Sequence, residues 1–253
     1  KSEPFDSNPG EEENSQAVET FDLYEKVRLS VTSETTYDQR KGFFSYSSAH
    51  QQMAENFKDE NNPQPVAETS VMLPGTLADD GVDPTSLGSA FHELAQIMVE
   101  TQSKVDEKTI DRLCLKNSVP QRAVSRVKQA LELWSNSTIR QEALAHDVVI
   151  AESPFTLQVD SVYGNYVEGA IDLLAYNKGS KDALVVDYKT GDKGLSATQI
   201  YEHHQMQANF YAYVLMQRGF TKVECVFVCV EVEEAGQPHV ARYTFDENHQ
   251  PRL

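Results

Sequence analysis

Two short segments in the second half of the chain could carry metal-dependent chemistry. One ends in Gly169-Ala170-Ile171-Asp172, and the other is Asp187-Tyr188-Lys189-Thr190-Gly191. Because side chains alternate along a strand, Asp187 and Lys189 would project from one face while Tyr188 points away. Carboxylate oxygens suit Mg²⁺ or Mn²⁺, and a neighbouring lysine can orient or deprotonate a water molecule. The same spacing is also common in a half-exposed hairpin that has no site.

The turn between these segments predicts how they pair. Gly179-Ser180 fits a two-residue type II′ hairpin turn, and this choice sets Asp172 opposite Asp187. Their Cβ atoms would then lie about 5 Å apart. Two like charges so placed in a buried sheet need a cation between them or a proton on one of them. A divalent metal ion is the simpler of these explanations.

His92 follows Gly88 by one helical turn, in the sequence Gly-Ser-Ala-Phe-His. A lone histidine is more often a packed or solvated side chain than a ligand. Gln96 stands where the H-E-x-x-H pattern requires its second histidine, which argues against a zinc peptidase.

The segment 197–217 has polar side chains at three- and four-residue steps, which would share one helix face. They are Tyr201, His204, Gln207 and Tyr211. They could form a solvated stripe. Alternatively, Gln207 and Tyr211 could donate hydrogen bonds to phosphate oxygens beside the metal ion.

The elements that must position these residues are visible as periodic patterns. Helices are expected at 84–101, 119–136 and 197–217, with a shorter one near 106–116. Asp83-Pro84, Ser118-x-x-Gln121 and Gly219 are the expected end signals of these helices. Strands are expected at 147–151, 155–160, 166–175, 183–189, 222–232 and 239–245. This order predicts an α/β layered fold.

Charge divides the chain at about residue 80. Residues 1–80 hold 16 acidic and 6 basic side chains and few apolar clusters. We expect them to be a partly ordered acidic extension, with short elements at Phe21 to Val31 and Phe43 to His50, that links to an upstream region. Residues 81–253 are expected to form the folded domain.

Composition restricts the function further. The chain has 253 residues, 40% of them hydrophobic, and a net charge of −17, which is opposite to the charge of a free-standing nucleic-acid binder. No apolar run could span a membrane, and no phosphate-binding G-x-x-x-x-G-K-[ST] motif occurs, so no ATP site is expected. Cys225 and Cys229 would lie about 13 Å apart in one strand, too far for a disulfide. With Cys114 they predict buried thiols in the cytoplasm.

Four motifs occur in a fixed order: G-x-x-x-H at 88–92, G-x-I-D at 169–172, D-Y-K-T-G at 187–191 and Q-x-x-x-Y at 207–211. Together they resemble the RecB-type nuclease domain of the PD-(D/E)XK superfamily, as at the C-terminus of AddA-like bacterial helicase-nucleases of the UvrD/RecB family. The resemblance covers about residues 84–245. It implies a restriction-endonuclease-like mixed central sheet flanked by helices.

The resemblance also assigns roles to individual residues. It implies that His92, Asp172 and Asp187 are metal ligands together with the Tyr188 carbonyl, and that Lys189 is catalytic with Asp172 and Asp187. Gln207 and Tyr211 would position the DNA strand. Glu142 lies where such domains often have an acidic residue.

The implied function is a Mg²⁺- or Mn²⁺-dependent DNA exonuclease in double-strand break repair and recombination. Its partners would be an upstream helicase motor and a partner subunit that deliver single-stranded DNA, so the segment alone would bind DNA weakly. Three cysteines without the required spacing argue against an iron-sulfur cluster. Two alternatives remain open: a catalytically silent scaffold or DNA-holding module, and a hydrolase of small phosphoesters.

Overall fold

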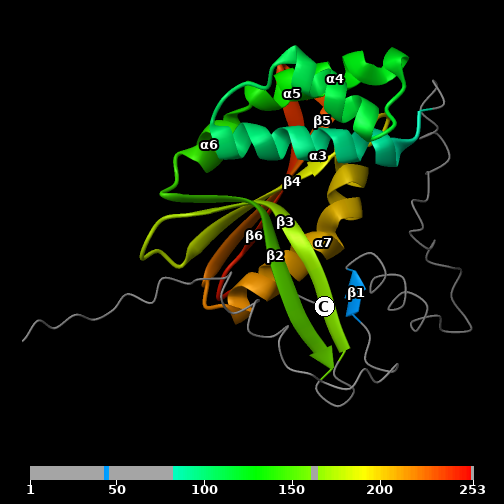
Figure 1. Cartoon of the computed structure of the whole chain (residues 1–253). Helices are drawn as coiled ribbons and strands as arrows, with labels where there is room; N and C mark the ends of the chain where they lie inside the picture. The colour runs from blue at the N-terminus through cyan, green and yellow to red at the C-terminus, as the bar shows by residue number, and fades with distance from the viewer. Residues whose placement is uncertain (1–42, 46–81, 161–164, 252–253) are drawn as a thin grey trace, which may run out of the picture. The chain divides into compact units, whose positions relative to one another are not determined.

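The computed structural model describes residues 43–45, 82–160 and 165–251 (Figure 1). Six strands form one mixed sheet, and helices pack on both of its faces. The expected α/β class with a mixed central sheet is therefore confirmed. The element predicted at Phe21 to Val31 lies outside the described residues, as does the boundary near residue 80. Of the element predicted at 43–50, the structure describes only 43–45.

Strand β3 (Asn165–Tyr176) pairs with three other strands of the sheet. Strand β2 (Val148–Asp160) pairs with it antiparallel along its whole length. Its other edge pairs with two strands in turn: β1 (Phe43–Ser45) runs parallel to residues 166–168, and β4 (Asp182–Lys189) runs antiparallel to residues 173–176. Beyond β4, the parallel β5 (Lys222–Glu234) and the antiparallel β6 (Gln237–Phe245) complete the sheet.

Helices cover the two faces unequally (Figure 1). One face packs against α3 (Pro84–Thr101), α4 (Glu107–Lys116), the 3₁₀ turn η1 (Gln121–Ala123), α5 (Val124–Ser135) and α6 (Thr138–Leu144). The other face packs against α7 (Ala197–Gln217). Trp134 is fully buried in the first core and Phe227 in the second. Each face of the sheet therefore has a core of its own.

The helix ends can be compared with the capping residues that the sequence predicted. Asp83 caps α3 by accepting from the N–H groups of Thr85 and Ser86, as the sequence predicted. Gly219, with φ of 97°, follows the end of α7 as expected. The capping box predicted at Ser118 is wrong: Ser118 adopts φ of 61° in the turn that ends α4, and η1 begins only after Pro120. Helix α6 was not predicted.

The hairpin between β3 and β4 has the predicted register but a different turn. Leu173 pairs with Val186 and Tyr176 with Ala183, and the same register continued by one residue sets Asp172 opposite Asp187. The turn hydrogen bond runs from the N–H of Ser180 to the carbonyl of Asn177, and Gly179 has φ of 79°. Gly179 is therefore the third residue of a four-residue turn, and the predicted type II′ assignment is wrong.

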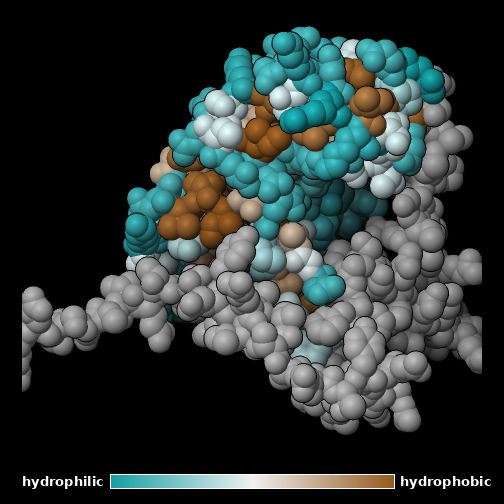
Figure 2. All heavy atoms as spheres, in the orientation of Figure 1, coloured by the Kyte–Doolittle hydropathy of each residue, from teal (hydrophilic) through white to brown (hydrophobic). Residues whose placement is uncertain are grey.

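Two further expectations can be compared with the structure. Cys114, Cys225 and Cys229 are buried free thiols, as predicted. Among the described residues, no helix has the length and apolar character needed to cross a bilayer. On the face seen in Figure 2, hydrophilic side chains cover most of the described surface, with smaller hydrophobic areas between them.

Candidate active site

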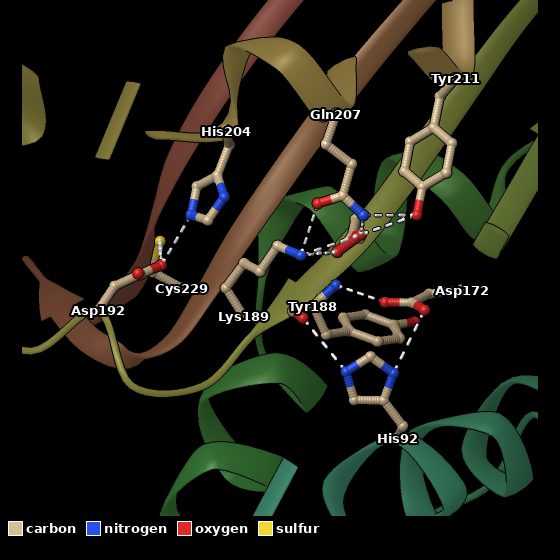
Figure 3. A network of polar contacts seen from close by, with 10 residues as sticks. His92, Asp172, Tyr188, Lys189, Asp192, His204, Gln207, Tyr211 and Cys229 are labelled. Atoms are coloured by element: carbon tan, nitrogen blue, oxygen red, sulfur yellow. Dashed lines mark hydrogen bonds and ion pairs between the residues drawn. The ribbon is translucent and has the colours of Figure 1, made fainter. Parts of the chain in front are cut away.

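Helix α3 brings His92 close to β3 and β4. Its Nδ1 lies 3.2 Å from Oδ1 of Asp172, and its Nε2 lies 3.2 Å from the backbone carbonyl of Tyr188 (Figure 3). One turn earlier, a Cβ added at Gly88 would lie 3.1 Å from Oγ1 of Thr190. The glycine thus permits the close approach of α3 to the segment that follows β4, and this approach places the imidazole beside both strands.

Asp172 links β3 to β4 where their backbone ladder ends. Its Oδ2 accepts a 2.7 Å hydrogen bond from the backbone N–H of Tyr188, and its Oδ1 faces His92. Packing requires a glycine at position 169 of the G-x-I-D motif, because a Cβ there would lie 2.6 Å from Cζ of Phe155. Asp172 is therefore fixed from two sides.

Strand β4 supplies the next two polar residues on its α7 face, as the period-two pattern predicted. Asp187 and Lys189 form an ion pair with Nζ 2.9 Å from Oδ2. The Asp187 side chain is only 3% exposed. Tyr188 points to the opposite face, where its ring packs edge-on against Phe91 and Trp134. The Tyr188 side chain thus serves the core, while its carbonyl faces the site.

Helix α7 closes the site from the other face through Gln207 and Tyr211 (Figure 3). Gln207 Oε1 accepts from Lys189 Nζ at 2.8 Å, and its Nε2 donates to Asp187 Oδ1 at 3.0 Å. The Tyr211 hydroxyl donates to the same Oδ1 at 3.2 Å and is buried. In this structure Gln207 holds both Asp187 and Lys189 in place, and Tyr211 holds Asp187. A direct contact with DNA stays a prediction.

Glu152 is a site residue that the sequence analysis missed. Its carboxylate lies with His92 and Asp172 in a group whose ligand atoms are all within 4.8 Å of one another. Its backbone has φ of 49°, the left-handed region that costs a side-chain-bearing residue energy. Strained backbone of this kind tends to occur at functional sites. Glu142 of α6, which the resemblance suggested, instead forms an ion pair with Arg242 of β6.

The strain at Glu152 coincides with a change of face in β2 and β3. Ala151 packs in the core beneath α3, whereas Phe155 packs in the core beneath α7, although the two residues are four positions apart and should share a face. In β3, Ile171 and Leu173 are divided between the two cores in the same way. The alternation is therefore interrupted in both strands at the level of Glu152 and Asp172.

Burial and charge shift the protonation of these groups. Burial alone would lower the pKa of His92, but the hydrogen bond and the charge of Asp172 raise it to about 9. Burial raises the pKa of Asp187, and burial with the charge of Asp172 raises that of Glu152. Burial would lower the pKa of Lys189, but Asp187 raises it. Three carboxylates thus share a small region that a cation would stabilise.

The donor atoms fit a divalent metal ion. Oδ2 of Asp187 is buried and receives no well-formed hydrogen bond from a described residue, although the ammonium of Lys189 lies near it. The carboxylates of Asp172 and Glu152, the Tyr188 carbonyl and the His92 imidazole are the other donors nearby. Oxygen-rich sets of this kind suit Mg²⁺ or Mn²⁺. Asp187 is not part of the tight group formed by His92, Glu152 and Asp172.

Comparisons with known proteins bear on this site. A solved structure that resembles the chain is that of a candidate exonuclease from Eubacterium rectale, with 11% sequence identity and a TM-score of 0.38. The match covers 64% of this chain and 60% of that one, and a likeness at this level does not by itself establish a shared activity. A search of curated protein sequences found no match. The model of the PD-(D/E)XK nuclease superfamily matches residues 68–251, and the chain therefore belongs to this superfamily.

Proposed function

We propose that the chain is a metal-dependent nuclease that hydrolyses DNA phosphodiester bonds. The observation that supports this best is the arrangement of Asp187 and Lys189. An aspartate with a buried, under-bonded oxygen is held 2.9 Å from a lysine ammonium, and Gln207 fixes both side chains. Membership of the nuclease superfamily gives this arrangement its chemical context.

Each residue would have a distinct task. Asp187, Asp172, Glu152, His92 and the Tyr188 carbonyl would hold the ion. A divalent ion bound there would supply an activated water and would neutralise charge on the scissile phosphate.

Lys189 would act on the reacting phosphate. Among the described residues its Nζ has two hydrogen-bond partners, Asp187 and Gln207, and an ammonium has three donors. The remaining N–H could reach a phosphate oxygen or the attacking water. Fixed donors at such a position stabilise charge as it develops and need no reorganisation during the reaction.

The acidic character of the chain supports a more specific proposal. A net charge of −17 opposes phosphate binding, so we propose that helicase and partner-subunit regions deliver single-stranded DNA to this domain. Such an arrangement would suit an exonuclease of the helicase-nuclease type in break repair. The test is fluorescence anisotropy with a labelled single strand at physiological salt. Affinity weaker than micromolar is expected, and submicromolar binding would contradict this placement.

A Mn²⁺ titration by calorimetry separates the nuclease from a catalytically silent scaffold. A nuclease binds Mn²⁺ stoichiometrically, and the binding is lost in Asp187→Ala. Lys222→Ala is the control, because Lys222 lies at the start of β5 and pairs with Glu224 rather than with a residue of the site. The absence of stoichiometric Mn²⁺ binding in the wild-type chain would favour the scaffold.

A further inference from the structure

A second cluster of metal-binding side chains lies next to the active site. Asp192 in the loop after β4, His204 in α7 and Cys229 in β5 converge from three separate elements (Figure 3). They are 8%, 4% and 0% exposed, respectively. In Figure 3 the cluster lies to one side of Lys189, away from His92. None of the three has a task in the proposed nuclease mechanism.

The three side chains lie close enough together to form a coordination shell. Nε2 of His204 lies 3.0 Å from Oδ2 of Asp192, and Sγ of Cys229 lies 3.3 Å from the same oxygen. All three ligand atoms are within 4.8 Å of one another. Tetrahedral zinc with its usual bond lengths separates nitrogen from oxygen by about 3.3 Å and sulfur from oxygen by about 3.5 Å. Small shifts of the side chains would therefore admit the ion.

The surroundings hold the ligands in place before any metal binds. The His204 ring stacks on Phe227, with centroids 4.9 Å apart and planes 4° apart. Cys229 lies in a paired part of β5, with Lys189 of β4 on one side and His239 of β6 on the other. The entropy lost on metal binding is therefore small, because the imidazole and the thiol are already ordered.

The ligand types select the metal. One carboxylate, one imidazole and one thiolate form a mixed set that suits zinc, whereas Mg²⁺ takes oxygen ligands and avoids sulfur. The charges also balance: a dication with an ionised Asp192 and an ionised Cys229 is neutral overall. Binding would release the thiol proton of Cys229, which a coordinated metal displaces. A cluster with no net charge can be buried at a lower cost in solvation free energy than a charged one.

We propose that Asp192, His204 and Cys229 form a zinc site that fastens the loop after Lys189 to α7 and β5. The site is independent of the catalytic metal and does not require the proposed nuclease activity. Its role is structural: Asp192 lies three residues after Lys189 in the loop that follows β4, and α7 carries Gln207 three residues after His204. A metal at this position would limit the freedom of both segments.

Cobalt spectroscopy tests the proposal with a signal that the carboxylate site cannot give. The chain is stripped of metal with a chelator, excess Mg²⁺ is added, and Co²⁺ is titrated in. We expect one equivalent of Co²⁺ to produce a thiolate-to-cobalt charge-transfer band in the near ultraviolet, and added Zn²⁺ to abolish the band. No band in the wild-type chain would overturn the proposal and leave the cluster as a hydrogen-bonded tie.

Variants of the three cysteines assign the band to one thiol. The Cys114→Ala/Cys225→Ala double variant retains Cys229 alone and should keep the full band. Cys229→Ser keeps a hydrogen-bond donor for Asp192, so it should fold, but it should lose the band. A band that persists in Cys229→Ser would also overturn the site. Zinc content by elemental analysis gives an independent measure, with one equivalent expected in the double variant and a loss of at least tenfold in Cys229→Ser.

Discussion

The backbone N–H of Tyr188 donates a 2.7 Å hydrogen bond to Oδ2 of Asp172. This bond lies just beyond the last backbone pair of β3 and β4, so a side chain takes the place of the missing ladder acceptor. The second oxygen of the same carboxylate faces His92 at 3.2 Å. One aspartate therefore fixes two strands and a helix around the peptide that precedes Lys189.

This double task predicts that two substitutions at Asp172 differ. Asp172→Ala leaves the buried N–H of Tyr188 without an acceptor, which costs about 1–3 kcal/mol of unfolding free energy. Asp172→Asn retains an acceptor oxygen, so its unfolding free energy should be close to that of the wild type. Both should lose stoichiometric Mn²⁺ binding. Urea unfolding and calorimetry measure the two effects. Equal stability of the two variants would show that the hydrogen bond contributes nothing to folding.

Gln207 is predicted to act on the rate more than on DNA affinity. Because it holds Lys189 and Asp187 in this structure, Gln207→Ala should lower kcat by about tenfold or more with little change in KM. Gln205→Ala is the matched control, since Gln205 lies on the exposed side of the same helix. Steady-state cleavage kinetics measure kcat and KM for the two variants and the wild type. A raised KM with an unchanged kcat would instead show that Gln207 only binds the DNA strand.

Glu152 offers a test that separates metal binding from backbone strain. At φ of 49°, Glu152→Gly relieves a conformation that Glu152→Ala retains, so the glycine variant should be more stable than the alanine variant by about 1 kcal/mol. Both should bind Mn²⁺ more weakly than wild type. The measurements are urea unfolding and metal titration. If both variants bind Mn²⁺ like the wild type, Glu152 is not a ligand.

The ion pairs of Arg242 predict a pH-dependent stability. Burial alone would raise the pKa of Glu224, but hydrogen bonds from Arg242 and Lys222 lower it below its usual 4.5. A carboxylate with a lowered pKa stabilises the fold above that usual value, and the contribution is lost as the pH falls through the lowered pKa. Arg242 also pairs with Glu142.

Arg242→Gln should therefore destabilise the chain at neutral pH by about 1 kcal/mol or less, because these side chains are partly exposed. The difference from wild type should shrink towards about pH 3.5, where carboxylates become protonated. Thermal unfolding of both proteins across this range measures it. A difference that grows as the pH falls would contradict the assigned direction.

The sequence predicted the parts of the site that depend on regular periodicity. Alternation in β4 put Asp187 and Lys189 on one face and Tyr188 on the other, and the structure agrees. The helix expected at 197–217 is α7, with the bounds that were predicted. The register that sets Asp172 opposite Asp187 also holds, although the turn that produces it is of another type. The strand register was predicted correctly despite the wrong turn type, because the pattern of buried side chains on each face also fixes the register.

The remainder of the site depends on exceptions to periodicity. Glu152 is brought to Asp172 where β2 and β3 both change face, and no local pattern indicates a left-handed glutamate inside a strand. The sequence put His204 on a polar helix face that could be a solvated stripe, yet it is buried against Phe227. Its partners Asp192 and Cys229 are distant in sequence, so only the packing of α7 on β5 brings the three together.

Cleavage of linear single-stranded DNA in Mg²⁺ or Mn²⁺ is the decisive test of the proposed nuclease activity. Wild type, Lys189→Ala and the control Lys222→Ala are compared at equal concentration, with circular dichroism to check the fold. We expect metal-dependent cleavage by wild type and control, and a loss of about 100-fold or more in Lys189→Ala. Cleavage by Lys189→Ala that equals wild type, with the fold intact, would contradict it.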